Sequence, residues 1–290
     1  MTTFRSITVK PCDAALGAFI TDVDLRQPTA EQRQEIRQAF VDYSVIFFRG
    51  QDLSPAEHIR FAEHWGKINV NRFFRPVDGY SQIAEVRKEP DQTVNIGRFW
   101  HTDHSYDQIP ALGSILLARE VPEGLGDTMY ASMYAAYEGL SQERKDLLNT
   151  LQAHHSSRHA FGNLTDDNPN KKEIGDRLAN PEAATQDALH PVVIRHPLSG
   201  RPALYVNHDF TVRFEGWTVE DSAALLEELY DHATQPEYTY RFRWEPGSIA
   251  IWDNRATHHK AINDYDGHRR LMHRITIEGE ALSPAFAPVG

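Results

Sequence analysis

The sequence predicts a mainly β protein that also contains α-helices, and three observations lead to this expectation. The last third of the chain is rich in strand-length segments, at residues 238–244, 248–252 and 269–277. Two capping boxes in the first third open amphipathic helices. At 290 residues the chain could form one large domain or two small ones. Sheet-rich barrels commonly run to this size as one domain, so a single domain over residues 1–290 is our expectation.

The elements of the N-terminal third follow from helix caps and short apolar runs. Residues 29–32 form a capping box that opens a helix reaching about residue 43. Residues 54–57 form a second capping box, with Pro55 at the first helical position, and its helix reaches about residue 65. Short strands are expected before and between these helices, at residues 7–10, 19–23 and 45–48.

The middle of the chain mixes strands, helices and two long polar segments. Strands are expected at residues 114–118 and 129–131, and helices at 132–140, 142–151 and 219–233. The polar segments 87–97 and 162–188 are expected to be loops, either lids over a site or solvated surface insertions. The tail at residues 281–290 is rich in Pro and Ala, and we expect it to be frayed.

Charge and composition exclude several classes of partner. The net charge is −11 and the pI about 5.7, which argues against a nucleic acid held by a broad basic field. An anionic substrate would therefore need a local cationic pocket. Cys12 is the single cysteine, so no intrachain disulfide or thiolate metal cluster is possible. No signal-peptide pattern opens the sequence and no apolar run is long enough to span a bilayer, so we expect a cytoplasmic protein without a membrane partner.

One short motif and a distant histidine offer the ligands of a metal site. His101 and Asp103 are two residues apart, a spacing that places both side chains on one face of an extended segment. His259 follows the strand at residues 248–252, on a turn, and its neighbour His258 is the rival ligand. Two imidazoles and one carboxylate occupy one face of Fe(II) in non-haem oxygenases and leave the other face open. A single histidine would more simply be an ordinary surface or core residue.

Two arginines provide an independent indication. If residues 269–277 form a strand, its period of two places Arg270 and Arg274 on the same face. They could belong to a solvated face with snorkelling side chains. Inside a barrel they would instead need buried anionic partners, and a co-substrate and a prime substrate would provide these.

Several further motifs run along nearly the whole chain. They are Trp100-His101-Thr102-Asp103, Gly126-Asp127-Thr128, His196-Pro197, Leu204-Tyr205-Val206-Asn207, Trp252-Asp253-Asn254-Arg255 and His273-Arg274. With these motifs the chain resembles the taurine dioxygenase (TauD/TfdA) family, which includes taurine dioxygenase and the phenoxyalkanoate-herbicide dioxygenases. The resemblance implies a double-stranded β-helix, or jelly-roll barrel, with flanking helices. It also implies Fe(II), 2-oxoglutarate and O₂ as cofactors, and a homo-oligomer, either a dimer or a tetramer.

The resemblance further implies roles for individual residues. His101, Asp103 and His259 correspond to the iron ligands, and by this analogy His259 is preferred over its neighbour. The Thr128 hydroxyl and Arg270 would hold the distal carboxylate of 2-oxoglutarate.

The substrate side of the site shows both agreement and departure. Arg274 would contact the acidic group of the substrate, and Phe161 and Phe210 match aromatic positions of the substrate pocket, although ordinary core packing explains them nearly as well. Taurine dioxygenase has histidines where this chain has Asn69 and Asn71, and a neutral amide cannot become cationic. Taurine is therefore a doubtful substrate. The segments 132–137 and 156–162 are closer to the aryloxypropionate dioxygenases, which suggests a larger and less polar acid.

The implied reaction couples decarboxylation of 2-oxoglutarate to succinate and CO₂ with hydroxylation of a small anionic substrate. Aryloxyalkanoates, sulfonates and sulfate esters are the expected classes. Two other readings stay open: a Zn²⁺ hydrolase that uses the same His₂/Asp site, and a non-catalytic jelly roll that binds a ligand. The hydrolase is disfavoured because no residue stands out as a separate general base.

Overall fold

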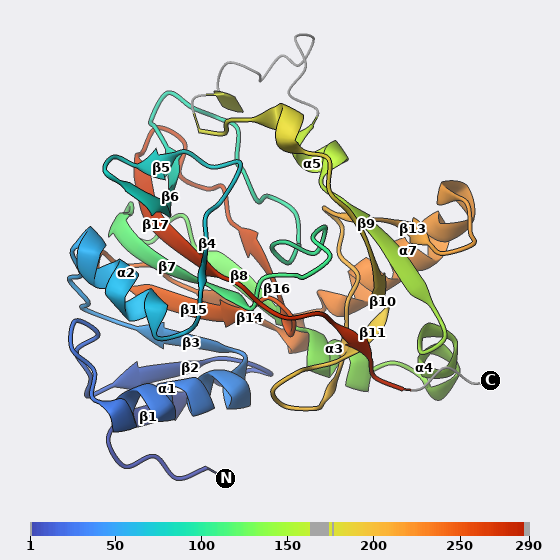
Figure 1. Ribbon diagram of the computed structural model, residues 1–290, viewed down its shortest axis with the longest axis horizontal. Coiled ribbons are helices and arrows are strands. Elements are labelled where there is room, and N and C mark those ends of the chain that lie inside the picture. The colour runs from blue at the N-terminus through green and yellow to red at the C-terminus, as the bar shows by residue number, and fades with distance from the viewer. Residues whose placement is uncertain (1, 163–173, 176, 287–290) are drawn as a thin grey trace.

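The computed structural model describes residues 2–162, 174–175 and 177–286, and a large, mostly antiparallel β-sheet organises it (Figure 1). In spatial order the main strands are β1 (Thr8–Pro11), β2 (Ala18–Thr21), β3 (Val45–Phe48), β15 (Ile249–Asp253), β7 (Gly113–Glu120), β17 (Arg270–Ile277), β6 (Tyr80–Lys88) and β5 (Pro76–Val77). Strands β2 and β3 are parallel, and the short β4 (Ile68–Asn69) pairs with the end of β17 opposite Thr276 and Ile277.

A smaller sheet faces this one. Its strands, in order, are β14 (Thr239–Phe242), β8 (Thr128–Ser132) and β16 (Thr257–Ala261). Apolar side chains from both sheets form one buried cluster, in which Phe47 stacks on Phe242 with ring centroids 4.1 Å apart. Two antiparallel sheets that close on a shared core are the architecture of a jelly roll. The predicted double-stranded β-helix is therefore confirmed.

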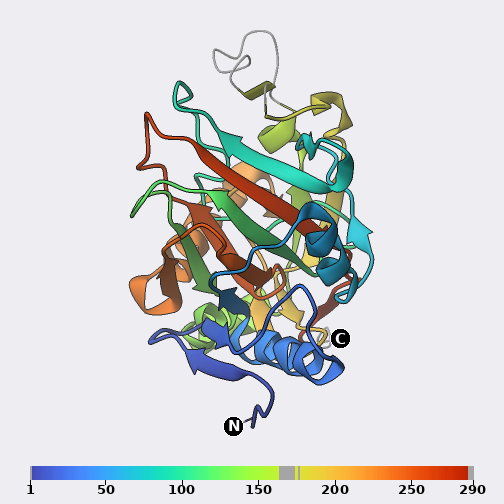
Figure 2. The ribbon, with the colours of Figure 1, turned by 90° about the vertical axis from the view of Figure 1, so that its left-hand side faces the viewer.

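Two helices cover the outer face of the large sheet (Figure 2). They are α1 (Ala30–Tyr43) and α2 (Pro55–Glu63). Both predicted capping boxes are present, with the N–H of Gln32 donating to Thr29 Oγ1 at 3.2 Å and the N–H of Glu57 donating to Ser54 Oγ at 3.3 Å. These caps satisfy amide groups that would otherwise lack partners at the helix N-termini, and so fix where each helix begins.

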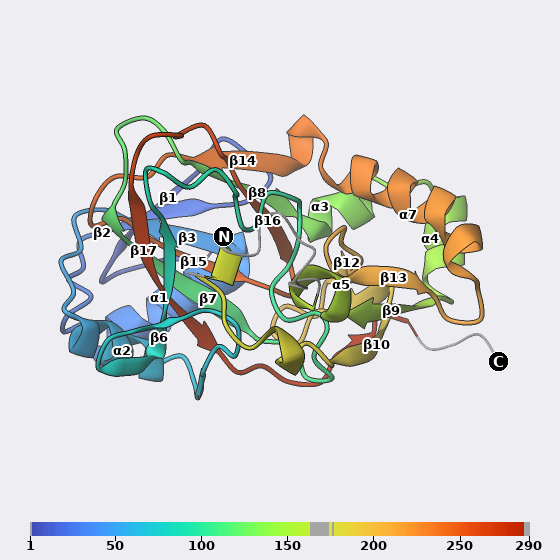
Figure 3. The same ribbon diagram turned by 90° about the horizontal axis from the view of Figure 1, so that it is seen from above.

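The remaining elements gather at the end of the molecule away from α1 and α2 (Figure 3). They are α3 (Met133–Glu138), α4 (Gln142–Leu148), α5 (Arg158–Phe161), α7 (Val219–Ala233), the 3₁₀ helices Pro181–Ala183 and Pro236–Tyr238, β9 (Gln152–Ser156), β10 (Asp187–Pro191), β11 (Val193–Arg195), β12 (Pro202–Leu204), β13 (Thr211–Phe214) and β18 (Ser283–Pro284). One apolar cluster there includes side chains of α3, α7, β9, β11, β12 and β13.

No helix in the described part of the chain is long and apolar enough to cross a membrane.

Three expectations about loops and ends are partly wrong. The first residues of the segment 87–97 belong to β6, whose charged side chains hid its alternation, and residues 187–188 of the second segment belong to β10. The tail is not frayed up to residue 286, because β18 pairs with β11 and Ala285 is buried. The rest of the tail and residues 163–173 and 176 lie outside the described part of the chain.

Candidate metal centre

Backbone pairing brings the two halves of the predicted metal motif together. The N–H of His101 donates to the carbonyl of His259 at 3.1 Å, and the N–H of His259 donates back to the carbonyl of His101 at 2.8 Å. The Thr102 hydroxyl donates to the carbonyl of Asn254 and so anchors the same segment to the turn before β16. The two histidines are therefore neighbours in an antiparallel bridge, although they are far apart in the sequence.

His259 lies in the middle of the strand β16, and the expectation that it lies on a turn is wrong. The turn between β15 and β16 ends at Ala256, before His259. It is tightened at its start, where the Asp253 carboxylate accepts hydrogen bonds from the N–H and the Nε of Arg255, both at 2.9 Å. Since side chains alternate along a strand, His259 faces Asp103 and His258 faces the other side. There His258 lines a second, smaller cavity with residues of α7.

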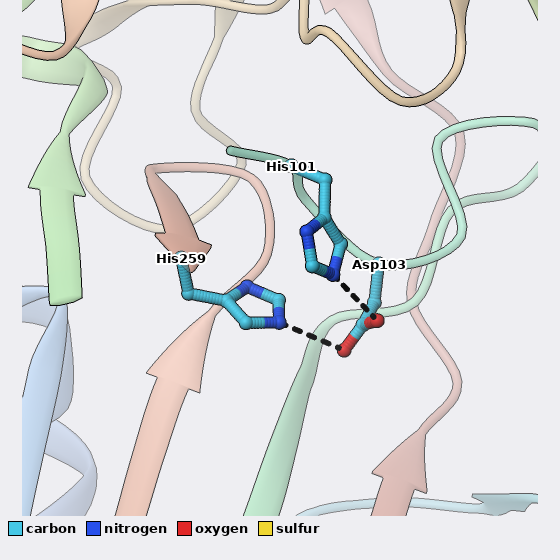
Figure 4. Close-up of side chains that lie close together, drawn as sticks. All are labelled: His101, Asp103 and His259. Atoms are coloured by element: carbon cyan, nitrogen blue, oxygen red, sulfur yellow. Dashed lines mark ion pairs between the residues drawn. The ribbon is translucent and has the colours of Figure 1, made fainter. Parts of the chain in front are cut away.

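The three predicted ligands form one buried group (Figure 4). One ligand atom from each of His101, Asp103 and His259 lies within 4.8 Å of the others. The two histidine Nε2 atoms each lie 3.9 Å from a different oxygen of the Asp103 carboxylate. Two nitrogens and a carboxylate that converge in this way fit a divalent transition metal with its remaining positions open.

The charges of the ligands also suit a metal. Burial alone would raise the pKa of Asp103, but the charges of Arg274, His259 and His101 outweigh it and hold this pKa well below its usual range. Burial, and then the charge of His101, lowers the pKa of His259 well below the usual value for histidine. The site therefore offers an ionised carboxylate and a neutral imidazole, which are the forms that bind metals.

A cavity of about 460 Å³ opens beside the metal ligands. It is lined by the three ligands and by both predicted arginines, so the two arginines share a face as the strand period predicts. A solvated face is the wrong reading of this strand, because Arg270 and Arg274 are only 5% and 8% exposed. Buried cations on a cavity wall need anionic partners.

Arg270 lacks a carboxylate partner among the described residues. Its Nε donates to the carbonyl of Gly126 at 3.2 Å, and its guanidinium carbon lies 5.9 Å from the centre of the Trp244 ring and 6.0 Å from that of Tyr265. Thr128 lines the same cavity, and its Oγ1 accepts a hydrogen bond from Trp244 Nε1 at 2.9 Å. Because Trp244 fills an acceptor position, the hydroxyl proton of Thr128 is left to donate to a ligand.

Arg274 has a partner that the sequence did not predict. Its Nη1 donates to both oxygens of Asp103, at 3.2 and 3.3 Å, and its guanidinium carbon lies 4.6 Å from the centre of the Phe74 ring. The expectation that bound anions alone would neutralise this arginine is therefore wrong, because Asp103, a predicted metal ligand, lies next to it.

The structure brings most of the predicted substrate residues to the cavity. Phe161 and Phe210 line it, and the ring of Phe210 lies 6.1 Å from that of His101. Asn71 also lines it, although its Oδ1 accepts from two backbone N–H groups of the following turn. Asn69 lies in β4 opposite Thr276 and is not among the lining residues.

Sequence reasoning missed several residues of the cavity wall, namely Phe74, Arg177, His208, Asp209 and Tyr265. Asp209 follows the motif Leu204–Asn207 by two residues, so a longer reading of that motif could have found it. Tyr265 and Arg177 lie in segments without a motif, and only the fold brings them to the site. Both predicted lid segments contribute, with residues 94–97 and 177–178 in the lining.

Comparison with known proteins agrees with this geometry. The profile of the family described as "Taurine catabolism dioxygenase TauD, TfdA family" matches residues 8–276. The chain belongs to this family.

It is 35% identical to an alpha-ketoglutarate-dependent sulfate ester dioxygenase of Pseudomonas putida, over 94% of this chain and 90% of that protein. It is 31% identical to the alpha-ketoglutarate-dependent 2,4-dichlorophenoxyacetate dioxygenase of Cupriavidus pinatubonensis, over 96% and 99% of the two chains. A taurine dioxygenase structure from Burkholderia xenovorans superposes with a TM-score of 0.81 at 32% identity, over 97% of this chain and 93% of that one.

Family membership sets the reaction class. The protein is a 2-oxoglutarate-dependent non-haem iron dioxygenase that acts on a small molecule, with Fe(II), 2-oxoglutarate and O₂ as its cofactors. The dioxygenase is thus favoured over the zinc hydrolase and the non-catalytic jelly roll.

Proposed function

We propose that His101, Asp103 and His259 bind Fe(II), that Arg270 and Thr128 hold the distal carboxylate of 2-oxoglutarate, and that the enzyme hydroxylates an organic anion with an apolar body. Alkyl sulfate esters are the first candidates. One observation carries this proposal: a buried His₂/Asp group and a buried arginine without a carboxylate partner in the described residues line the same cavity. When bound, the iron supplies the oxidising power by reaction with O₂ and 2-oxoglutarate.

The chain's own residues supply binding and orientation. The planar fork of Arg270 suits two parallel hydrogen bonds to a carboxylate. Thr128 adds a third donor, since its Oγ1 already accepts from Trp244. Burial strengthens these contacts, because little water competes for the donors. The co-substrate is thereby held at a fixed distance from the ligands on the same cavity wall.

The anion of the prime substrate is proposed to bind at Arg274. Arg274 lines the cavity, and its hydrogen bonds in the described part of the chain come from Nη1 alone, which leaves other N–H groups of the guanidinium for a bound anion. Phe74, Phe161 and Phe210 provide apolar walls around it for an alkyl or aryl body. Hydroxylation of the carbon beside the ester oxygen of an alkyl sulfate would give an unstable product that breaks down to an aldehyde and sulfate.

The similarity to known proteins supports this order of candidates. The sulfate ester dioxygenase of Pseudomonas putida is 35% identical, and the dichlorophenoxyacetate enzyme is 31% identical. Taurine is disfavoured, because Asn71 cannot be cationic and its side-chain oxygen is engaged by the backbone. Aryloxyalkanoates and bulkier sulfonates follow sulfate esters as candidates.

The decisive experiment measures succinate formed from 2-oxoglutarate under Fe(II) and air. Alkyl sulfates, alkyl sulfonates, aryloxyalkanoates and taurine are compared at equal concentration, with no added acid as the baseline. We expect the strongest stimulation by alkyl sulfates, together with one sulfate released per succinate. Stimulation by none of these acids would overturn the proposal for the substrate class.

Assembly and location belong to the same proposal. We propose a cytoplasmic homo-oligomer of single-domain subunits, a dimer or tetramer on family resemblance alone, without a nucleic-acid partner. The net charge of −11 supports the last point. The segments 87–97 and 162–188 are proposed lids, because described residues of both line the cavity. Light scattering after size-exclusion chromatography tests the assembly.

A further inference from the structure

Asp209 is an isolated carboxylate in a cationic cavity. Among the described residues, Asp103 is the one other acid that lines this space. The described cationic residues of the lining are Arg87, Lys88, Arg98, Arg177, Arg270 and Arg274. None of them forms an ion pair with Asp209 within the described part of the chain. The Asp209 carboxylate instead lies 3.5 Å from His101 Nδ1 and 3.6 Å from His208 Nδ1.

A constrained turn holds Asp209 in this place. The turn joins β12 to β13 and is organised by the buried Asn207, whose Oδ1 accepts from the N–H of Phe210 at 3.1 Å. Asn207 Nδ2 donates to Ser105 Oγ at 3.0 Å. Ser105 lies two residues after Asp103, so this hydrogen bond ties the turn directly to the segment that carries two of the metal ligands. The distance between Asp209 and His101 is therefore set by a short chain of buried contacts.

The orientation of His101 explains what Asp209 contacts. The Nε2 atom of His101 faces the Asp103 carboxylate, so Nδ1 points away from the ligand group (Figure 4). An imidazole that binds a metal through Nε2 carries its proton on Nδ1. The carbonyl of Phe99 accepts a hydrogen bond from Nδ1 at 2.9 Å, and the Asp209 carboxylate lies 3.5 Å from the same nitrogen as a nearby negative charge. The carbonyl alone could fix the ring orientation, whereas the carboxylate adds a negative charge.

The second histidine ligand lacks such a partner. His259 Nδ1 is buried and has no hydrogen-bond partner in the described residues. The two imidazoles of the site therefore differ: one has an acidic group behind it and the other does not. A carboxylate behind a ligating imidazole makes the ligand more basic and fixes its tautomer.

We propose that Asp209 is a positioning residue for the metal, which acts through His101: its carboxylate places a negative charge 3.5 Å from Nδ1, whose proton the Phe99 carbonyl accepts. The inference rests on the proposed function, since it takes His101 to be a ligand. Loss of such a carboxylate typically lowers metal affinity on the order of 10-fold. Asp209 would then contribute to metal affinity and to the electronic properties of the site without touching the substrate.

Metal binding to the apoprotein tests this proposal. Titration with Co(II), followed by calorimetry and by the visible spectrum of the bound ion, is compared for the wild type and Asp209→Asn, Asp209→Ala and Asp209→Glu. We expect Asp209→Asn and Asp209→Ala to weaken Co(II) binding by about 10-fold and to shift the spectrum. Asp209→Glu should restore part of the affinity, because it keeps the charge. A general loss of folding would not be rescued in this way.

Two controls separate the possible outcomes. Asp146→Asn removes an exposed charge far from the metal motif in sequence, so it should bind Co(II) as the wild type does. His101→Ala should lose binding, and if it does not, the proposed metal site itself is wrong. If His101→Ala loses binding while Asp209→Asn keeps both affinity and spectrum, the present inference alone is overturned. An effect of Asp209→Asn confined to the KM of the organic substrate would likewise overturn it and make Asp209 a substrate contact.

Discussion

Arg274 Nη1 lies 3.2 Å from Asp103 Oδ1, so the arginine proposed to bind the substrate anion also contacts a metal ligand. The same guanidinium is the largest of the charges that hold the pKa of Asp103 down against burial. An anion bound at Arg274 would share its positive charge with the Asp103 carboxylate. If both proposed roles hold, substrate binding and the metal centre are linked through this one side chain.

The first prediction concerns this arginine. Arg274→Ala should weaken use of the organic anion far more than use of 2-oxoglutarate, because the substrate loses a buried charged partner. Truncation of one member of such a pair costs roughly 3–5 kcal/mol. The measurement is KM and kcat for the best acid and for 2-oxoglutarate. Arg274→Lys is the matched control, since it keeps the charge but loses the planar fork. Equal turnover of a neutral analogue and of the charged substrate would contradict a role in reading charge.

The second prediction separates the two adjacent histidines of β16. His259→Ala should abolish Fe(II) binding and substrate oxidation, because its Nε2 lies 3.9 Å from the Asp103 carboxylate. His258→Ala should keep metal binding, because that side chain lines the other cavity. Asp103→Ala should behave like His259→Ala. Metal content after anaerobic loading and desalting measures all three, and the opposite result for the two histidines would reassign the ligand.

The third prediction uses a glycine that lies against Arg270. Gly126 has φ of +70°, and a Cβ at this position would lie 3.1 Å from Arg270 Cδ and 3.2 Å from its Nε. Gly126→Ala should strain the turn and displace the guanidinium. We expect the KM for 2-oxoglutarate to rise several-fold while Co(II) binding changes little. Gly124→Ala is a matched control, since it has the same φ of +70° but nothing within 4 Å of the added Cβ.

Arg270→Ala gives the limiting case of the same prediction. This variant should raise the KM for 2-oxoglutarate steeply, because the buried distal carboxylate of the co-substrate would lose its cation. The expected loss of binding free energy is roughly 3–5 kcal/mol. An unchanged saturation curve for 2-oxoglutarate would show that another residue binds its distal carboxylate.

The sequence predicted those parts of the fold that depend on local chemistry. The caps at Thr29 and Ser54 and the face shared by Arg270 and Arg274 are properties of short segments, and the structure confirms them. The resemblance to a known family added the jelly roll. Local chemistry did not predict β6, because its many charged and polar residues lie on a strand that is apolar only where it meets the core.

The parts of the site that were missed depend on contacts between distant segments. The backbone bridge between His101 and His259 forms because the fold brings two segments into register, and no pattern in either segment contains it. The pairing of Arg274 with Asp103 likewise crosses from β17 to the loop before β7. Asp209 reaches His101 through a turn anchored by Asn207. Such contacts need the tertiary structure.

The last prediction concerns stability against acid. His58 of α2 is fully buried, and burial, followed by the charges of Arg119 and His273, lowers its pKa from the ordinary 6.5 to about 3. Between these two values the unfolded chain binds a proton at this residue and the folded chain does not. His58 should therefore contribute a fall in the free energy of unfolding as the pH falls from about 6.5 toward 3, at up to about 1.4 kcal/mol per pH unit for this one residue.

Urea unfolding of the metal-free protein at several pH values between 7.5 and 4.5 measures this slope. His58→Gln should flatten it, because the proton taken up on unfolding at this site is lost, whatever the variant's stability at neutral pH. Burial also lowers the pKa of other histidines, which contribute in the same direction and should leave part of the slope in place; they include His155, His258, His259 and His273. The exposed His268 serves as the control, and His268→Gln should keep the wild-type slope. If His58→Gln and His268→Gln gave the same pH dependence as the wild type, His58 would have to be protonated as readily in the folded protein as in the unfolded chain.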